Sequence, residues 1–220
     1  MHPLSLTLKS RNYVMNMRLI IIIALFFLAT ETCYGQKNES YSALPESIVK
    51  REIAFFVKAA SGMLIDSSLL LTEIKLSRCS NDFVIFESGN LIALDKLISI
   101  YSKPVNLNSI TLTDKGKLWG ISEDLPTTQI SEVRFLHYKY QLLLADSAIS
   151  GLYNPKFCIN PKKNNKIGEA TSTNCKAYQS KDKRRVYIYM LNGEGAEQYE
   201  VTWIINESNY YGRVIDKVML

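Results

Sequence analysis

The chain has 220 residues, of which 47% are hydrophobic and 21% charged, a composition typical of a globular protein rather than a disordered or fibrous one. At about 150 residues per domain, this length allows one domain with an extension. The net charge is +5, and removing residues 1–35 leaves 23 basic and 20 acidic residues. An excess of this size favours neither nucleic acid nor a membrane surface as a partner.

The N-terminal segment has the features of a signal peptide. Leu19 to Ala29 is an uninterrupted apolar run of eleven residues, which fits a signal-peptide hydrophobic region of about 7–15 residues and is shorter than the roughly 18 needed to span a bilayer. Arg18 precedes the run, and cleavage after Gly35 places small residues at the required positions. An uncleaved anchor and lipidation of Cys33 are the alternatives.

The predicted organisation follows from that cleavage. We expect residues 1–35 to be a signal peptide, residues 36–43 a flexible leader, and residues 44–220 a single domain. No later segment approaches membrane-spanning length, so the mature protein is predicted to be periplasmic or extracellular. Met15 or Met17 are alternative start sites.

Three cysteines remain after cleavage, and export permits disulfides. Cys158 and Cys175 flank a polar stretch, and joining them would remove loop entropy worth about 3 kcal/mol. We therefore predict a Cys158–Cys175 disulfide. Cys79 is then a buried thiol, an intermolecular link, or the true partner of one of the other two.

The first half of the domain is predicted to begin with a helix and two strands. Pro45 suits a first helical turn, and apolar residues follow at helical spacing up to a stop at Gly62. Residues 67–77 and 82–87 read as strands joined by a turn at 78–81.

Two further helices are predicted from apolar spacing. Residues 91–101 carry apolar side chains at helical intervals and stop before Pro104. After a predicted hairpin at 108–122, a third helix is expected over 128–150, ending at Gly151. Its apolar face would carry Val133, Leu136, His137, Tyr140, Leu143 and Leu144.

The C-terminal region is predicted to be an antiparallel meander. Residues 185–191, 199–205 and 210–218 are rich in β-formers, and turn-forming residues separate them. Together with the helices, this predicts an α+β fold with helices packed on an antiparallel sheet, as in cystatin-like or NTF2-like folds.

Few residues point to catalysis. His137 is the only histidine after cleavage, and on an apolar stripe it is more readily explained as a core residue. Ser47 and Lys50 form an S-x-x-K match without its companion motifs. The sequence has no P-loop, no dinucleotide fingerprint and no histidine metal motif, so no cofactor and no metal are predicted.

The C-terminal strands supply the predicted binding surface. Alternation assigns Val186, Ile188, Met190, Val201, Trp203, Ile205, Val214 and Val218 to the core. The opposite face then collects Arg185, Tyr187, Tyr189, Glu200, Tyr211 and Arg213. Tyrosine and arginine are enriched in interface hot spots, which favours recognition. The alternatives are an exposed sheet stabilised by cross-strand pairs, or a helix covering these side chains.

A basic stretch precedes this meander. Eight lysines and arginines between Lys162 and Arg185 would suit an anionic glycan, a lipid headgroup or an acidic partner. A solvated loop explains the same charges.

The chain also resembles a group of small, exported, functionally uncharacterised proteins of Bacteroidetes type. The residues concerned are the Cys-Tyr-Gly-Gln ending of the signal and two C-terminal segments, Tyr199 to Ile205 and Tyr210 to Asp216. The resemblance implies an extracytoplasmic location and no known activity.

These observations lead to one main hypothesis and two alternatives. The first is an exported, non-enzymatic module that binds a protein or glycan of the cell envelope through the C-terminal sheet face. The second is an exported enzyme with a cleft near His137, and the third is a structural envelope component.

Overall fold

The structure is a computed structural model that describes residues 40–44, 46–60, 71–89, 94–106, 118–121, 125–159, 173–192 and 198–217. The predicted signal peptide, most of the predicted hairpin at 108–122 and Val218 lie outside the described residues. The helices are η1 (Tyr41–Ala43), α2 (Ser47–Ala60) and α3 (Asp146–Ile149). The strands are β1 (Thr72–Cys79), β2 (Phe83–Gly89), β3 (Leu94–Pro104), β4 (Thr128–His137), β5 (Tyr140–Leu143), β6 (Cys175–Gln179), β7 (Arg185–Asn192), β8 (Tyr199–Asn206) and β9 (Asn209–Lys217).

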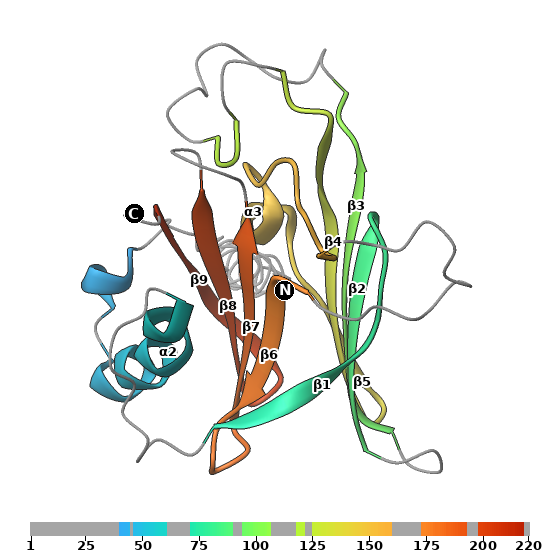
Figure 1. The fold of residues 1–220 in the computed structure, drawn as a ribbon. Helices are drawn as coiled ribbons and strands as arrows, with labels where there is room; N and C mark the ends of the chain where they lie inside the picture. The colour runs from blue at the N-terminus through green and yellow to red at the C-terminus, as the bar shows by residue number, and fades with distance from the viewer. Residues whose placement is uncertain are drawn as a thin grey trace, which may run out of the picture. The chain divides into compact units, whose positions relative to one another are not determined.

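All nine strands form one antiparallel sheet with the order β5-β4-β3-β2-β1-β6-β7-β8-β9. The sheet curves nearly into a closed barrel (Figure 1). The predicted α+β fold is therefore wrong, because most of the described residues are in strands and α2 is the only long helix among them.

The predicted helix over 128–150 is instead the β4–β5 hairpin followed by α3. In β4, Tyr101 pairs with Glu132 but Ser102 pairs with Ile130, so the register skips one residue of β4. This bulge separates the inward-facing Ile130 and Val133 by three residues. The predicted apolar stripe combines inward-facing Val133 and Leu144 with Leu143 from the opposite face, and this mixture of faces imitates helical spacing.

The predicted helix over 91–101 is also wrong, since β3 occupies most of this range. Ile98 and Ile100 are fully buried and face inward with the period of two that a strand requires. Leu97 and Tyr101 of the predicted stripe lie on the opposite face from Ile98 and are only partly buried, so apolar residues on both faces of β3 imitate a helical stripe.

Other elements confirm the sequence predictions. α2 forms where a helix was predicted, β1 and β2 lie within a few residues of the two predicted strands, and β7, β8 and β9 form the predicted meander. Of the predicted helical stripe, Val49, Ile53 and Phe56 are buried.

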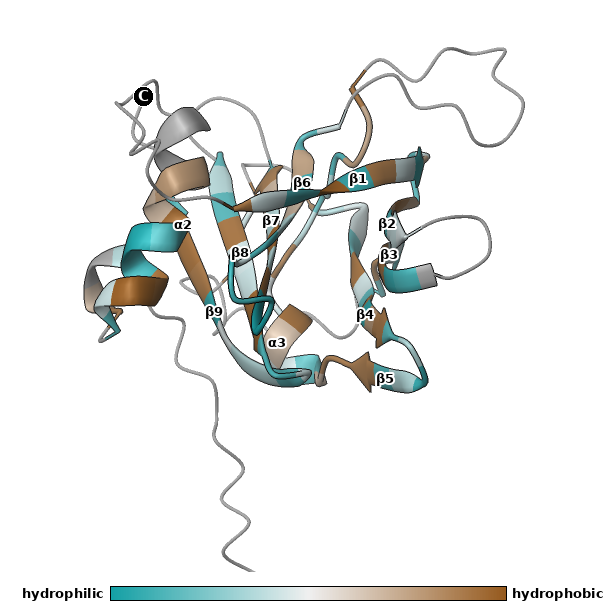
Figure 2. Cartoon of the chain, turned by 90° about the horizontal axis from the view of Figure 1, so that it is seen from below, coloured by the Kyte–Doolittle hydropathy of each residue, from teal (hydrophilic) through white to brown (hydrophobic). Residues whose placement is uncertain are grey.

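The sheet is buried on both faces over its C-terminal half. Its inner face packs a single core that includes Phe86, Ile98, Phe135, Ile188 and Trp203. A second cluster fills the space between the outer face and α2, and Figures 1 and 2 show α2 lying over β7, β8 and β9.

β5 and β9, the two end strands of the sheet, do not pair with each other in the described residues. The segment after β5 bridges the gap between them. The Ala148 carbonyl accepts hydrogen bonds from Trp203 Nε1 (2.8 Å) and from Arg213 Nη1 (2.9 Å). On the other side, Ile130 N donates to the Leu152 carbonyl at 3.0 Å. The segment thus ties β4 to β8 and β9.

Candidate functional site

The predicted C-terminal sheet surface is covered by α2. Tyr187 and Tyr189 are buried, and the Phe56 ring lies 5.8 Å and 5.6 Å from their ring centroids. Phe56 also stacks on Tyr178 at 4.9 Å. The alternative that a helix covers these tyrosines is therefore what the structure shows, and they offer no exposed recognition surface.

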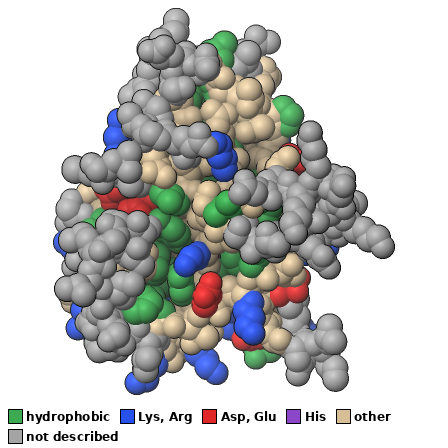
Figure 3. All heavy atoms as spheres, in the orientation of Figure 1, with side chains coloured by type: hydrophobic (Ala, Val, Ile, Leu, Met, Phe, Trp, Pro, Cys, Tyr) green, Lys and Arg blue, Asp and Glu red, His purple; other side chains and the backbone are tan. Residues whose placement is uncertain are grey.

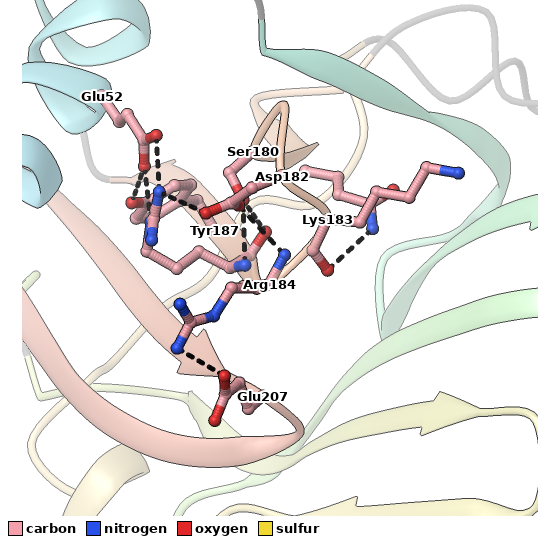
Figure 4. A network of polar contacts seen from close by, with 9 residues as sticks. Glu52, Ser180, Asp182, Lys183, Arg184, Tyr187 and Glu207 are labelled. Atoms are coloured by element: carbon pink, nitrogen blue, oxygen red, sulfur yellow. Dashed lines mark hydrogen bonds and ion pairs between the residues drawn. The ribbon is translucent and has the colours of Figure 1, made fainter.

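Arg185 joins this layer through an ion pair with Glu52 of α2. Figure 4 labels Glu52 beside Tyr187. Its Nε and Nη2 donate to the two carboxylate oxygens of Glu52 at 2.9 Å and 3.0 Å, and the hydroxyl of Tyr187 donates to the same carboxylate. Hydrogen bonding to Glu52 raises the pKa of Arg185, and burial raises the pKa of Tyr187. These groups are satisfied by one another, which marks them as a structural clamp for α2.

Glu200 lies in the same layer, next to a second carboxylate. It accepts a hydrogen bond from the Tyr189 hydroxyl at 3.1 Å and pairs across the sheet with Asp216, which accepts from Tyr41 N at 2.7 Å. Burial raises the pKa of Glu200 to about 7, the Tyr189 hydrogen bond opposes this rise, and Asp216 adds to it. Burial also raises the pKa of Asp216. The folded protein therefore binds protons at Glu200 more tightly than the unfolded chain does.

Arg213 and Tyr211 were predicted to share this layer, but both lie outside it. Arg213 pairs with Trp203 and faces the inner core, where its Nη1 donates to the carbonyls of Ala148 and Ser150, each at 2.9 Å. Tyr211 sits at the bulge of β9 and is exposed. Faces alternate along β9 as predicted, but the face assigned to the inner core is the wrong one. Val214, predicted to face inward, is buried on the α2 side instead.

The disulfide differs from the prediction. Cys79 is bonded to Cys158, and Cys175 is a free, buried thiol whose pKa burial raises to about 12. The predicted Cys158–Cys175 pair is therefore wrong, although the possibility that Cys79 is the true partner was left open. Cys79 ends β1, and the bond ties that strand to the segment following α3. A disulfide is consistent with an oxidising compartment.

Two of the five described basic residues in the basic stretch form ion pairs. Arg184 pairs with Glu207 at 2.5 Å, and Arg185 pairs with Glu52. On the face shown in Figure 3, basic and acidic side chains are interspersed. Lys162, Lys163 and Lys166 lie outside the described residues.

Around His137 the sheet register assembles a row of polar residues that the sequence did not reveal. Ser88 pairs with Lys96, Lys96 with His137, and His137 with Tyr140, so the four residues run across β2, β3, β4 and β5. Each lies two positions from an inward-facing residue of the apolar core on its own strand, so the row shares the inner face.

A carboxylate from β3 organises this row. The Oδ2 of Asp95 lies 2.7 Å from Lys96 Nζ, and its Oδ1 lies 3.3 Å from His137 Nε2. Burial raises the pKa of Asp95, but Lys96, His137 and Tyr138 together lower it below its usual value. Lys96 is only 3% exposed, so its charge is balanced locally by Asp95.

The arrangement does not support nucleophilic catalysis. Ser88 and His137 lie two strands apart, about 9–10 Å at the usual strand spacing, which is too far for a serine–histidine hydrogen bond. Lys96 lies between them but is engaged by Asp95. Among the described residues, no three His, Cys, Asp or Glu side chains gather as a metal-binding group.

The β4–β5 hairpin carries the most concentrated exposed apolar surface in the described part of the chain. Seven large hydrophobic side chains are exposed among all the described residues, and three of the seven lie in the six-residue stretch 138–143 of this hairpin. Tyr138 is 69% exposed, Leu143 55% and Tyr140 44%. We call these three residues the hairpin surface. Tyr140 and Leu143 were expected in a buried helical stripe, and the two-residue connection Tyr138-Lys139 contains none of the Asn, Asp or Gly residues that usually signal a hairpin.

The chain matches no protein-family model, no curated protein and no solved structure. The resemblance to exported Bacteroidetes-type proteins therefore stays an expectation from the residues. In the described segments, no helix is both long enough and apolar enough to cross a membrane.

Proposed function

We propose that the protein is an exported, non-enzymatic binding module that recognises a protein partner of the cell envelope through the hairpin surface. The observation that carries this proposal is the clustering of Tyr138, Tyr140 and Leu143 in the exposed hairpin. Tyrosine brings a large apolar area with a polar tip and loses little conformational entropy on binding, as interface residues commonly do.

The chemistry of the hairpin surface favours protein over glycan. Leu143 offers only apolar area, and Arg134, the charged residue that pairs with it across β4 and β5, already forms an ion pair with Glu132 at 2.7 Å. The predicted signal peptide and the disulfide support export.

Site-specific photo-crosslinking tests this proposal. A photoreactive p-benzoylphenylalanine would replace Tyr138, and the matched control would carry it in place of Tyr211, which is also an exposed tyrosine but lies on the edge strand at the other end of the sheet. In cells, we expect a defined protein adduct from position 138 and none from position 211.

Adducts from position 211 alone would return recognition to the C-terminal strands. No adduct from either position would contradict the proposal and favour a structural role. Protection of position 138 from protein crosslinking by added envelope polysaccharide would identify a glycan as the ligand instead.

A further inference from the structure

The exposed hairpin also ends the sheet with an edge strand, β5, whose outer side has no partner strand in the described part of the chain. β5 occupies one end of the strand order, and Figure 2 shows it at the periphery beyond β4. Leu144 N donates to the Val133 carbonyl at 3.0 Å. Because inward and outward backbone groups alternate along an antiparallel strand, the N–H and C=O groups of Gln141 and Leu143 point away from β4.

The two edge strands of the sheet differ in the features that prevent another strand from pairing with them. β9, at the opposite end, has η1 beside it through the bond from Tyr41 N to Asp216, a bulge at Tyr211, and a charged residue, Arg213, pointing inward. These are the devices that natural sheets use to block edge pairing. In the described residues β5 has none of these three features, although it is short at four residues, and its sequence, Tyr-Gln-Leu-Leu, contains neither proline nor lysine.

We propose that an extended segment of the partner protein adds to β5 as a tenth strand. This inference rests on the proposed function and specifies how the hairpin surface would be used. The segment would exchange backbone hydrogen bonds with Gln141 and Leu143, while its alternate side chains contact Tyr140 on the inner face and Leu143 on the outer face. Lys139, exposed at the turn, favours an acidic residue in the partner next to the hairpin.

A second copy of this chain is a poorer occupant of the edge. Symmetric pairing of two β5 strands would join four residues on each side, whereas stable interfaces use roughly 20–30 residues a side. An extended segment of another protein is free to continue past both ends of β5 and to contact Tyr138 as well.

The test uses peptides from a displayed library of random 12-residue sequences, selected on the mature protein. Affinity of the selected peptides would be measured for wild type, Gln141→Pro and Gln141→Ala. Both substitutions remove the same side chain, but only proline removes the outward N–H, which contributes nothing to pairing with β4. We expect Gln141→Pro to weaken binding at least tenfold and Gln141→Ala to change it less than threefold.

A second measurement covers the case in which Gln141→Pro does not fold. In wild type, bound peptide should slow amide exchange at Gln141 and Leu143 at least tenfold. Equal binding by the two variants, no protection of these amides, or failure to select any peptide would overturn strand addition. A concentration-dependent dimer that Gln141→Pro abolishes would also overturn it by identifying a second copy as the occupant.

These outcomes are separable from failure of the proposed function. Crosslinks from position 138 together with equal affinities for Gln141→Pro and Gln141→Ala would retain the hairpin surface and remove only the strand pairing.

Discussion

The ion pair beneath α2 makes the most quantitative stability prediction. Glu52 is buried and accepts hydrogen bonds from both Arg185 and Tyr187. Replacing it with alanine leaves a mostly buried guanidinium and a buried hydroxyl without this acceptor. Removing one partner of a buried pair typically costs about 3–5 kcal/mol. Asp182 still lies 3.3 Å from Arg185 and is partly exposed, so we expect a loss near the lower end, about 3 kcal/mol.

The assay is urea unfolding of wild type, Glu52→Ala and Glu207→Ala, read as the free energy of unfolding. Glu207 pairs with Arg184 at the surface, where ion pairs contribute about 0–1 kcal/mol, so it is the matched control (Figure 4). By temperature, a loss of 3 kcal/mol corresponds to a fall of about 6–12 °C in Tm for a chain of this size. Equal losses of less than 1 kcal/mol for both variants would refute the clamp.

Three further predictions concern the disulfide, one glycine and one carboxylate. Peptide mapping should find Cys79 linked to Cys158, with Cys175 reacting with thiol reagents only after unfolding. Gly120→Ala should destabilise by about 1–3 kcal/mol in thermal unfolding, because φ is +80° and the added Cβ would lie 2.6 Å from a backbone carbonyl. Since the pKa of Glu200 is raised to about 7 on folding, stability should fall from pH 5 to pH 8, and Glu200→Gln should flatten that dependence.

Contrary results would be equally specific. A Cys158–Cys175 peptide would restore the pairing expected from the sequence. Wild-type stability for Gly120→Ala, or a pH profile unchanged by Glu200→Gln, would contradict the local geometry on which each prediction depends.

The predictable parts of the fold are those in which one residue pattern had one interpretation. α2 has a single apolar stripe, and the meander of β7 to β9 has strong β-formers between clear turns. In both cases local preference and burial agree, which is the condition for reading structure from sequence.

The β4–β5 hairpin could not be read in this way because apolar residues on both of its faces fall at helical spacing. Val133 and Leu144 face the inner core, whereas Leu143 lies on the opposite face and is exposed. The same misreading concealed the hairpin surface, since Tyr140 and Leu143 then appeared to continue a buried stripe. The spacing of apolar residues along one segment does not predict the register in which strands pair.

The row of polar residues around His137 also depends on the register between strands. Ser88, Lys96 and His137 are distant in sequence and become neighbours only because β2, β3 and β4 pair as they do. Conversely, Tyr187 and Tyr189 were correctly placed on one face, but nothing in those strands specified that α2 would cover it.

Hydrogen exchange of individual backbone amides in the free protein tests the availability of the β5 edge most directly. The account predicts fast exchange at Gln141 and Leu143, whose amides point away from β4, and exchange at least tenfold slower at Tyr140 and Leu142, whose amides pair with β4. Slow exchange at all four amides would show that the edge is already covered, which would contradict its role in binding a partner.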